Sequence, residues 1–246
     1  MPPAVPDAVD LRIAALVAER IDDGACIQAG IGSIPNGVLA ALRGHRDLGI
    51  HIELLSDGAA DLVERGVATG IHKVRRPGKV VTTFALGSAA LYEFLDGNAA
   101  IELLPVDWVN DPRVIAQEPR FVSINATTEV DFLGQAASET IAGRYWSGSG
   151  GQADFARGAM YSDGGQGFLV MRSTAAHGTI SRIVPRLREG SVVTTLKNTV
   201  DKVVTEHGVA ELRGRTIRQR TRALVAIADP AFREQLEVDA RALGWW

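Results

Sequence analysis

The most informative stretch of the chain is Gly49-Ile50-His51-Ile52-Glu53-Leu54-Leu55-Ser56-Asp57-Gly58. Apolar residues at positions 50, 52 and 54 alternate with polar ones, and a period of two is typical of a β-strand. Ser56–Gly58 interrupts the pattern, and a helix can begin at Ala59. We therefore expect Glu53 near the carboxyl end of a strand that enters a strand–loop–helix turn.

The expected position of Glu53 is one at which open α/β sheets bind ligands, because such sites lie at the carboxyl ends of the strands. A carboxylate there can act as a nucleophile when the site keeps it ionised and the substrate carries a good leaving group. A solvated carboxylate on an edge strand would give the same local pattern, so the rest of the chain has to distinguish the two.

The composition is that of a globular protein, with 246 residues, 46% hydrophobic and 22% charged, enough for one large or two small domains. A net charge of -3 argues against nucleic acid or an anionic membrane as a partner. Cys26 is the sole cysteine, which excludes a disulfide framework and fits a cytoplasmic location. We find no apolar run of about 18 residues, the length that spanning a membrane requires.

Residues 1–8 are rich in proline and are interpreted as a linker-like tail, with one catalytic domain over residues 9–246. The tail lacks the basic and apolar regions of a signal peptide. Asp7 can cap a helix that continues to about Ile21 and stops at Gly24. The strands and helices that follow alternate, which favours a largely parallel sheet. Strands are expected at 25–29, 50–54, 79–84, 101–105, 122–124, 128–132, 168–171, 192–195 and 203–205, and helices at 59–65, 88–95, 217–227 and 231–243.

Two glycine-rich loops accompany Glu53. The first, Gly30–Gly37, lies between an expected strand and a helix at Val38–Leu42, an order that places backbone N–H groups at a helix N-terminus, where anions bind. It lacks the third glycine of a dinucleotide fingerprint, so an oxyanion or phosphate cradle suits it better than a nicotinamide cofactor. The second, Ser147–Gln152, is either a flexible hairpin loop or another set of N–H donors. A nucleophile with preorganised donors is what acyl transfer requires.

Other polar residues remain open to two interpretations. Asn110 precedes Asp111-Pro112 and could be an Asx-turn residue, and Glu206 follows an expected strand, where it lines the same rim or is solvated. The five histidines show no metal-ligand spacing, and we expect no metal site. No Gly-x-Ser-x-Gly elbow is present.

Six motifs, at residues 29–39, 49–58, 106–114, 147–158, 181–185 and 204–208, resemble those of one family in the right order. From about Asp10 onward, the chain resembles the C-terminal half of the acetyl-CoA hydrolase/transferase family, which includes 4-hydroxybutyrate and succinyl-CoA:acetate CoA-transferases. The resemblance implies an α/β domain with an open mixed sheet and flanking helices, of the CoA-transferase (NagB/RpiA-like) kind.

The resemblance also implies roles for individual residues. Glu53 aligns with a nucleophilic glutamate that forms an acyl anhydride and then a glutamyl-CoA thioester, which an acceptor carboxylate or water resolves. Ile34 and Gly151 align with residues whose N–H groups form oxyanion holes, and Asn110 aligns with an asparagine that contacts the thioester or the glutamate. Coenzyme A is then substrate and product, and residues assigned to binding it are Gly30, Gly32, Ser33, Gly150, Gly178 and Glu206.

Two features depart from the family. Several relatives carry a lysine where this chain has Ala176, which removes one CoA-contacting charge. Family members also have a homologous N-terminal half, so we expect a fragment or a subunit of a split enzyme. Its partners would be acyl-CoA, a small carboxylate, and either that half or a second copy of the chain.

The first function expected is therefore acyl-CoA:carboxylate CoA-transferase or acyl-CoA hydrolase. One alternative is a CoA-binding half that is inactive without an N-terminal partner. Another is an enzyme like the sugar-phosphate isomerases, which share the broad fold but would need an acid–base pair near a phosphate site, and we see none.

Overall fold

A computed structural model describes residues 5–246, and its main sheet has six strands in the order β17-β16-β12-β7-β1-β2. All neighbouring strands are parallel except β16 and β17, so the expected open mixed sheet is confirmed. The strands are β1 (Cys26–Ala29), β2 (Gly49–Ile50), β7 (Phe121–Ala126), β12 (Gln166–Val170), β16 (Lys202–Thr205) and β17 (Gly208–Glu211).

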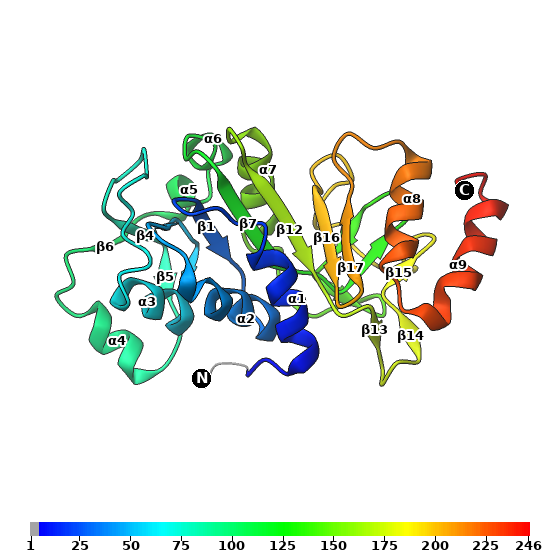
Figure 1. The fold of residues 1–246 in the computed structure, drawn as a ribbon, viewed down its shortest axis with the longest axis horizontal. Coiled ribbons are helices and arrows are strands. Elements are labelled where there is room, and N and C mark those ends of the chain that lie inside the picture. Colours follow the sequence, from blue (N-terminus) through cyan, green and yellow to red (C-terminus); the bar gives the residue numbers. More distant parts are fainter. Residues whose placement is uncertain (1–4) are drawn as a thin grey trace.

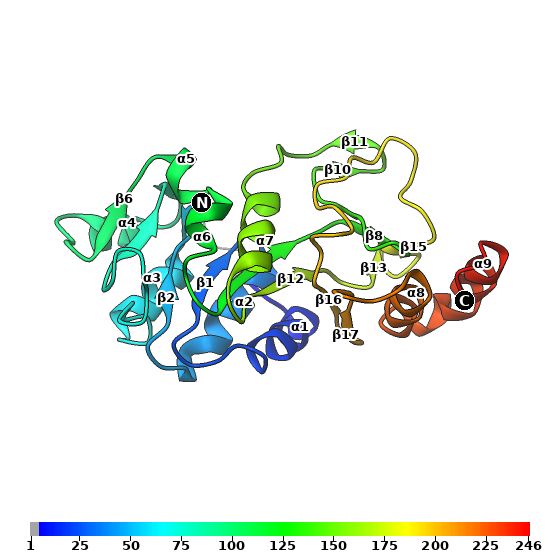
Figure 2. The ribbon, with the colours of Figure 1, turned by 90° about the horizontal axis from the view of Figure 1, so that it is seen from above.

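Helices cover both faces of this sheet (Figures 1 and 2). On one face lie α1 (Ala8–Ala18) and α2 (Ser33–Ala41), the latter followed by η1 (Leu42–Gly44), and α3 (Asp57–Glu64) packs beside α2. Their apolar side chains form a core with alternate residues of the strands, such as Ile27 and Phe168. On the other face, α7 (Gln152–Tyr161) packs with α5 (Val106–Val109) and α6 (Pro112–Ile115) around Phe121 and Phe155.

Short strands form five smaller sheets around the main one. The pairs and triplet are β3 (Leu54–Leu55) with β5 (Phe84–Ala85), β4 (Val80–Thr82) with β6 (Ile101–Leu103), β10 (Thr140–Ile141) with β11 (Arg144–Tyr145), β13 (Thr174–Ala175) with β14 (Ile180–Ser181), and β15 (Ile183–Val184) with β8 (Glu129–Asp131) and β9 (Ala136–Ala137). Helix α4 (Ala89–Leu95) lies near one end of the molecule, and α8 (Ile217–Ala226) and α9 (Pro230–Ala242) lie at the other (Figure 1). No helix from Val5 onward has both the length and the apolar character needed to cross a membrane.

Helix α1 begins as the sequence predicts. The Asp7 carboxylate accepts hydrogen bonds from the N–H groups of Val9 and Asp10, and Asp10 reaches back to complete a capping box. Ala8, placed in the tail by sequence, is therefore helical, while residues 1–4 of that tail lie outside the described part of the chain.

The strand expected over 50–54 is divided. Ile50 pairs with Ile27 in the main sheet, His51 bridges to Val81, and Leu54 pairs with Phe84. The chain thus changes its neighbouring strand twice within a few residues, and Glu53 lies at the bend between the two pairings. Alternation in the sequence reports extended backbone and carries no information about which strand each residue pairs with.

Two further expectations need correction. The loop expected over 30–37 is shorter, because α2 already begins at Ser33, where Pro35 fits the first turn of a helix. Residues 192–195 are not a strand and contribute only an isolated bridge between Thr195 and Ala136. The short helices α5 and α6 and the longer α7 were not anticipated.

Candidate active site

A cavity of about 600 Å³ lies where the order of the parallel strands reverses. After β1 the chain adds β2 on one side and β7 on the other, so the switch point falls between β1 and β7. The last residues of these two strands and those just after them, 29–32 and 125–128, form two walls of the cavity, and residues 146–152 form a third. Ligands bind at such switch points in open α/β sheets.

Glu53 borders this cavity and its backbone is tightly held. The Glu53 carbonyl oxygen accepts hydrogen bonds from the N–H groups of Thr83 (3.0 Å) and Phe84 (3.1 Å) and from the hydroxyl of Thr82 (3.1 Å). The bend is thereby fixed to the segment between β4 and β5. The half-buried side chain of Glu53 therefore lines the cavity from a fixed main chain.

Asn110 is brought to Glu53 from a distance of 57 residues along the chain. Its Nδ2 donates a hydrogen bond of 3.0 Å to Glu53 Oε2, while its buried Oδ1 has no donor among residues 5–246. Asn110 ends α5, and its N–H bonds to the Val106 carbonyl at 2.9 Å. The amide therefore contacts the carboxylate directly, and the Asx-turn alternative does not describe it.

The side chain of His51 contacts α5, the helix that ends at Asn110. The buried ring donates from Nε2 to the carbonyl oxygen of Val109 (2.7 Å) and stacks on Trp108, with ring centroids 5.6 Å apart. Burial lowers the pKa of His51 to about 4, so the ring is neutral at physiological pH. Both neighbours belong to α5, the helix that presents Asn110.

Gly151 completes the contact with Glu53. It caps the amino end of α7, and a Cβ built there would meet the Glu53 carboxylate, would lie 2.6 Å from Asn110 Nδ2, and would lie 3.0 Å from the Phe155 ring. Only glycine lets the backbone approach this closely. Glu53, Asn110 and Gly151 thus form one contact group, of which Glu53 and Gly151 line the cavity together with Gly150.

The first glycine-rich loop faces the same cavity. Gly30 and Gly32 line it, and Gly32 has φ 132° and ψ 171°, a conformation that only glycine adopts readily. The first intrahelical bond of α2 runs from the Asn36 N–H to the Gly32 carbonyl (3.0 Å). The N–H groups of Ser33 and Ile34 precede it, so they have no acceptor within the helix, which begins next to the cavity-lining Gly32.

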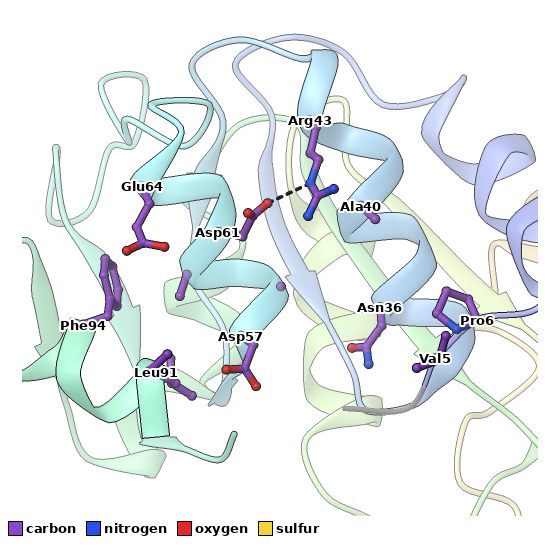
Figure 3. Close-up of a pocket in the computed structure, with 13 residues that line it drawn as sticks. Val5, Pro6, Asn36, Ala40, Arg43, Asp57, Asp61, Glu64, Leu91 and Phe94 are labelled. Carbon is purple, nitrogen blue, oxygen red and sulfur yellow. Dashed lines mark hydrogen bonds and ion pairs between the residues drawn. The ribbon is translucent and has the colours of Figure 1, made fainter. Parts of the chain in front are cut away.

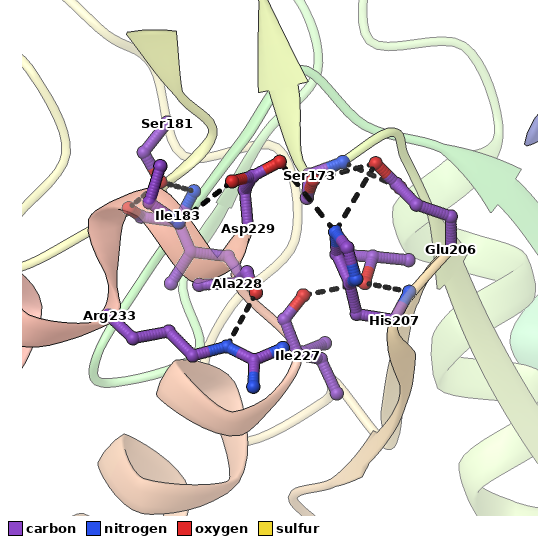
Figure 4. Close-up of polar contacts among 11 residues, drawn as sticks. Ser173, Ser181, Ile183, Glu206, His207, Ile227, Ala228, Asp229 and Arg233 are labelled. Carbon is purple, nitrogen blue, oxygen red and sulfur yellow. Dashed lines mark hydrogen bonds and ion pairs between the residues drawn. The ribbon is translucent and has the colours of Figure 1, made fainter. Parts of the chain in front are cut away.

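Two of the residues assigned to CoA lie apart from this cavity. Glu206 follows β16 and accepts hydrogen bonds from the N–H (2.9 Å) and hydroxyl (2.7 Å) of Ser173, with His207 Nε2 at 3.8 Å (Figure 4). Gly178 lies in the exposed turn of the β13–β14 hairpin with φ 86°. Neither borders the cavity of Glu53, and their contact with CoA stays a prediction.

A second hollow, of about 440 Å³, lies between α2, α3 and α4 (Figure 3). An ion pair between Arg43 and Asp61 (2.8 Å) joins η1, which follows α2, to α3 at its edge. The side chains of Glu64 and Phe94 face it from α3 and α4. It contains none of the residues assigned from sequence.

Metal ligands are not grouped anywhere in the described part of the chain: residues 5–246 bring no three His, Cys, Asp or Glu side chains together in a way that could hold an ion.

Comparison with known proteins agrees with this architecture. A family profile described as the acetyl-CoA hydrolase/transferase C-terminal domain matches residues 87–240. The chain belongs to the acetyl-CoA hydrolase/transferase family. Among curated relatives, it is 52% identical over 99% of its length to the succinyl-CoA:cyclohexane-1-carboxylate CoA transferase of Geobacter metallireducens, of which it covers 55%. It is 48% identical over 96% of its length to the 4-hydroxybutyrate coenzyme A transferase of Clostridium kluyveri, of which it covers 54%.

The fold is shared by solved structures. The structure of RipA from Yersinia pestis superposes with a TM-score of 0.95 at 41% identity, over 100% of this chain and 56% of that one. The chain thus spans about half the length of the relatives that it matches.

Two side chains of the site were not found from sequence. His51 stood in the most informative stretch, but no role was assigned to it there, and the structure shows it fully buried. Arg182 lies in the motif at 181–185 and lines the cavity, yet no role was assigned to it. For His51, the available signal in the sequence was its position as a polar residue between the apolar strand residues Ile50 and Ile52.

Proposed function

We propose that this chain carries the nucleophile and oxyanion donors of an acyl-CoA:carboxylate CoA-transferase or acyl-CoA hydrolase, with a covalent glutamyl-CoA thioester as intermediate. One observation carries the proposal: Glu53, which is in contact with Asn110 and Gly151, lines a switch-point cavity that both glycine-rich loops also line. The two relatives described above, both CoA transferases, support it.

The reaction follows from the groups present. The Glu53 carboxylate attacks the thioester carbonyl, the C–S bond breaks, and an acyl-glutamyl anhydride and CoA thiolate form. The thiolate then attacks the glutamyl carbonyl, releasing the acyl group as a carboxylate and leaving the glutamyl-CoA thioester. An acceptor carboxylate reverses these two steps to give a new acyl-CoA, whereas water would give free CoA. A thiolate leaves readily, so a weak carboxylate nucleophile suffices.

The surrounding donors suit the charge that develops. Each attack creates a tetrahedral oxyanion, and the N–H groups of Ile34 and Gly151 are the proposed donors to it. Asn110 Nδ2 holds the Glu53 carboxylate in position. Gly30, Gly32, Ser33 and Gly150 would cradle the thioester end of CoA, with Gly178 and Glu206 farther out.

We also propose that another chain segment closes the cavity. Three apolar side chains at its wall are exposed: Ile31 (62%), Phe84 (43%) and Trp146 (77%). Exposed apolar groups around a ligand cavity mark a surface that another body covers. The N-terminal half of the family or a second copy of the chain is the proposed cover, and without it the chain would bind CoA with little turnover. A cytoplasmic location is proposed from the unpaired, buried Cys26.

The test is CoA exchange between acetyl-CoA and a panel of carboxylates, with the chain alone and together with an N-terminal half from a relative. We expect exchange in the completed enzyme and its loss in Glu53→Gln, which is nearly isosteric but cannot form an anhydride. Glu93→Gln, on the exposed surface of α4, is the matched control. Exchange by Glu53→Gln within about tenfold of the wild type, or about 1.4 kcal/mol in activation free energy, would contradict the proposal.

A further inference from the structure

The cavity of Glu53 has a single cationic side chain in its lining within residues 5–246, that of Arg182. The residue connects β14 to β15, and its main chain is held on both sides. Its N–H bonds to the Ser173 carbonyl (2.9 Å), and its carbonyl accepts from the Val130 N–H (2.9 Å). Arg182 therefore enters the cavity wall from a fixed backbone.

The guanidinium of Arg182 has no ion-pair partner in the described part of the chain. Glu206 contributes a favourable charge, but its two oxygens are already bonded to Ser173. Arg172 adds an unfavourable positive charge and is itself paired with Asp10 at 2.8 Å. Burial, and then Arg172, lower the pKa of Arg182. A half-buried guanidinium in these surroundings is stabilised by an anion that the protein does not supply.

Four other polar side chains of the cavity already donate their hydrogens within the protein. The hydroxyls of Thr127 and Thr128 donate to the Ala137 carbonyl at 2.8 and 2.7 Å, and that of Ser138 donates to Thr127 Oγ1 at 3.0 Å. The Gln152 amide donates to Ser138 Oγ at 2.9 Å. Unlike these four side chains, Arg182 has side-chain donors with no acceptor among residues 5–246, and they remain for a ligand.

We propose that Arg182, which lines the same cavity as Glu53, binds the distal carboxylate of a dicarboxylic acyl group, of the succinyl type, while Glu53 reacts with the thioester carbonyl. The inference rests on the proposed function and adds a substrate class to it. A guanidinium matches a carboxylate with two parallel hydrogen bonds, which makes the pair both strong and directional. The phosphates of CoA are a less suitable partner, because the long pantetheine arm separates them from the thioester that Glu53 attacks.

A binding experiment tests Arg182 without requiring turnover. The 15N-labelled chain is titrated with succinate and with butyrate, which has the same number of carbons but one carboxylate, and Kd is taken from NMR shifts, including the arginine Nε–H signals. We expect succinate to bind at least about tenfold more tightly than butyrate, the preference expected for hydrogen bonds to a charged group. Arg182→Met should abolish the preference, and Arg182→Lys should retain part of it.

Arg218→Met, on the exposed surface of α8, is the matched control and should keep the preference. Equal affinity for the two acids in the wild type, or an unchanged preference in folded Arg182→Met, would overturn the proposal.

Kinetics separate this inference from the proposed function. In the completed enzyme, Arg182→Met should lower kcat/KM for succinyl-CoA at least about tenfold and change it for butyryl-CoA by less than about threefold. Absence of turnover with both acyl-CoA substrates would refute the proposed function. The NMR titration with succinate and butyrate would then test carboxylate binding by Arg182 on its own. Turnover of both, with equal losses in the variant, would refute the role of Arg182 alone.

Discussion

Replacing Gly151 by alanine tests the contact group most sharply, because the structure isolates its steric effect. Gly151 has φ −87° and ψ 5°, which alanine also adopts, so no backbone strain is introduced. The new methyl group would instead lie 2.6 Å from Asn110 Nδ2 and would meet the Glu53 carboxylate. An ordinary contact begins near 3.4 Å, so the Asn110 amide would have to retreat by roughly 1 Å.

The cost to catalysis can be worked from that displacement. The hydrogen bond of 3.0 Å between Asn110 and Glu53 would be broken or bent, and a hydrogen bond to a charged group contributes about 1.5 to 3 kcal/mol. A nucleophile misplaced by about 1 Å alone lowers a rate about 100-fold. We therefore expect kcat to fall at least about 100-fold, while overpacking lowers the free energy of unfolding by about 1 to 3 kcal/mol.

The assay is CoA exchange in the completed enzyme, with thermal unfolding measured on the same samples. Gly148→Ala is the control, because it lies in the same loop and a Cβ there has no neighbour within 4 Å. We expect it to behave as the wild type. A folded Gly151→Ala variant with kcat within about threefold of the wild type would refute the inference that this contact positions the nucleophile.

Three other outcomes follow from the same structure. Because burial lowers the pKa of His51 from 6.5 to about 4, the unfolded chain binds that proton more readily between these pH values. The contribution of His51 to the free energy of unfolding should be intact above pH 6.5 and should fall by roughly 3 kcal/mol towards pH 4. Denaturation curves of His51→Leu at different pH values should lack this decrease in the free energy of unfolding. A decrease equal to that of the wild type would contradict the assignment. Burial raises the pKa of Cys26 to about 12, so native protein should resist alkylation that labels unfolded protein at once, and rapid native labelling would disagree. Asn110→Ala should lower kcat about 10- to 100-fold, and an unchanged kcat would exclude it from positioning Glu53.

The parts of the site that sequence predicts are those encoded locally. The strand at Cys26–Ala29, the glycine-rich turn after it and the helix after Glu53 each have their own hydrophobic pattern and breaker residues, and each is present. The resemblance added the family, which the comparisons confirm. The capping of α1 by Asp7 was also readable, because it depends on residues only three apart.

What could not be predicted depends on contacts between distant segments. The bend at Glu53 arises because Ile50 and Leu54 pair with different strands, which alternation alone cannot reveal. Burial of His51 depends on Trp108 and Val109 of α5, a helix too short for a periodic signal. Residues 192–195 have strand-like composition, yet their backbone finds no continuous neighbouring strand.

The central claim is that Glu53 becomes covalently joined to CoA, and trapping that species tests it most directly. The completed enzyme is incubated with acyl-CoA alone, treated with borohydride to reduce a glutamyl thioester to an alcohol, digested, and analysed by mass spectrometry. The account predicts a changed mass confined to the peptide that contains Glu53, and no change in Glu53→Gln. Modification at Cys26, or continued exchange of CoA with the Glu53 peptide unmodified, would contradict it.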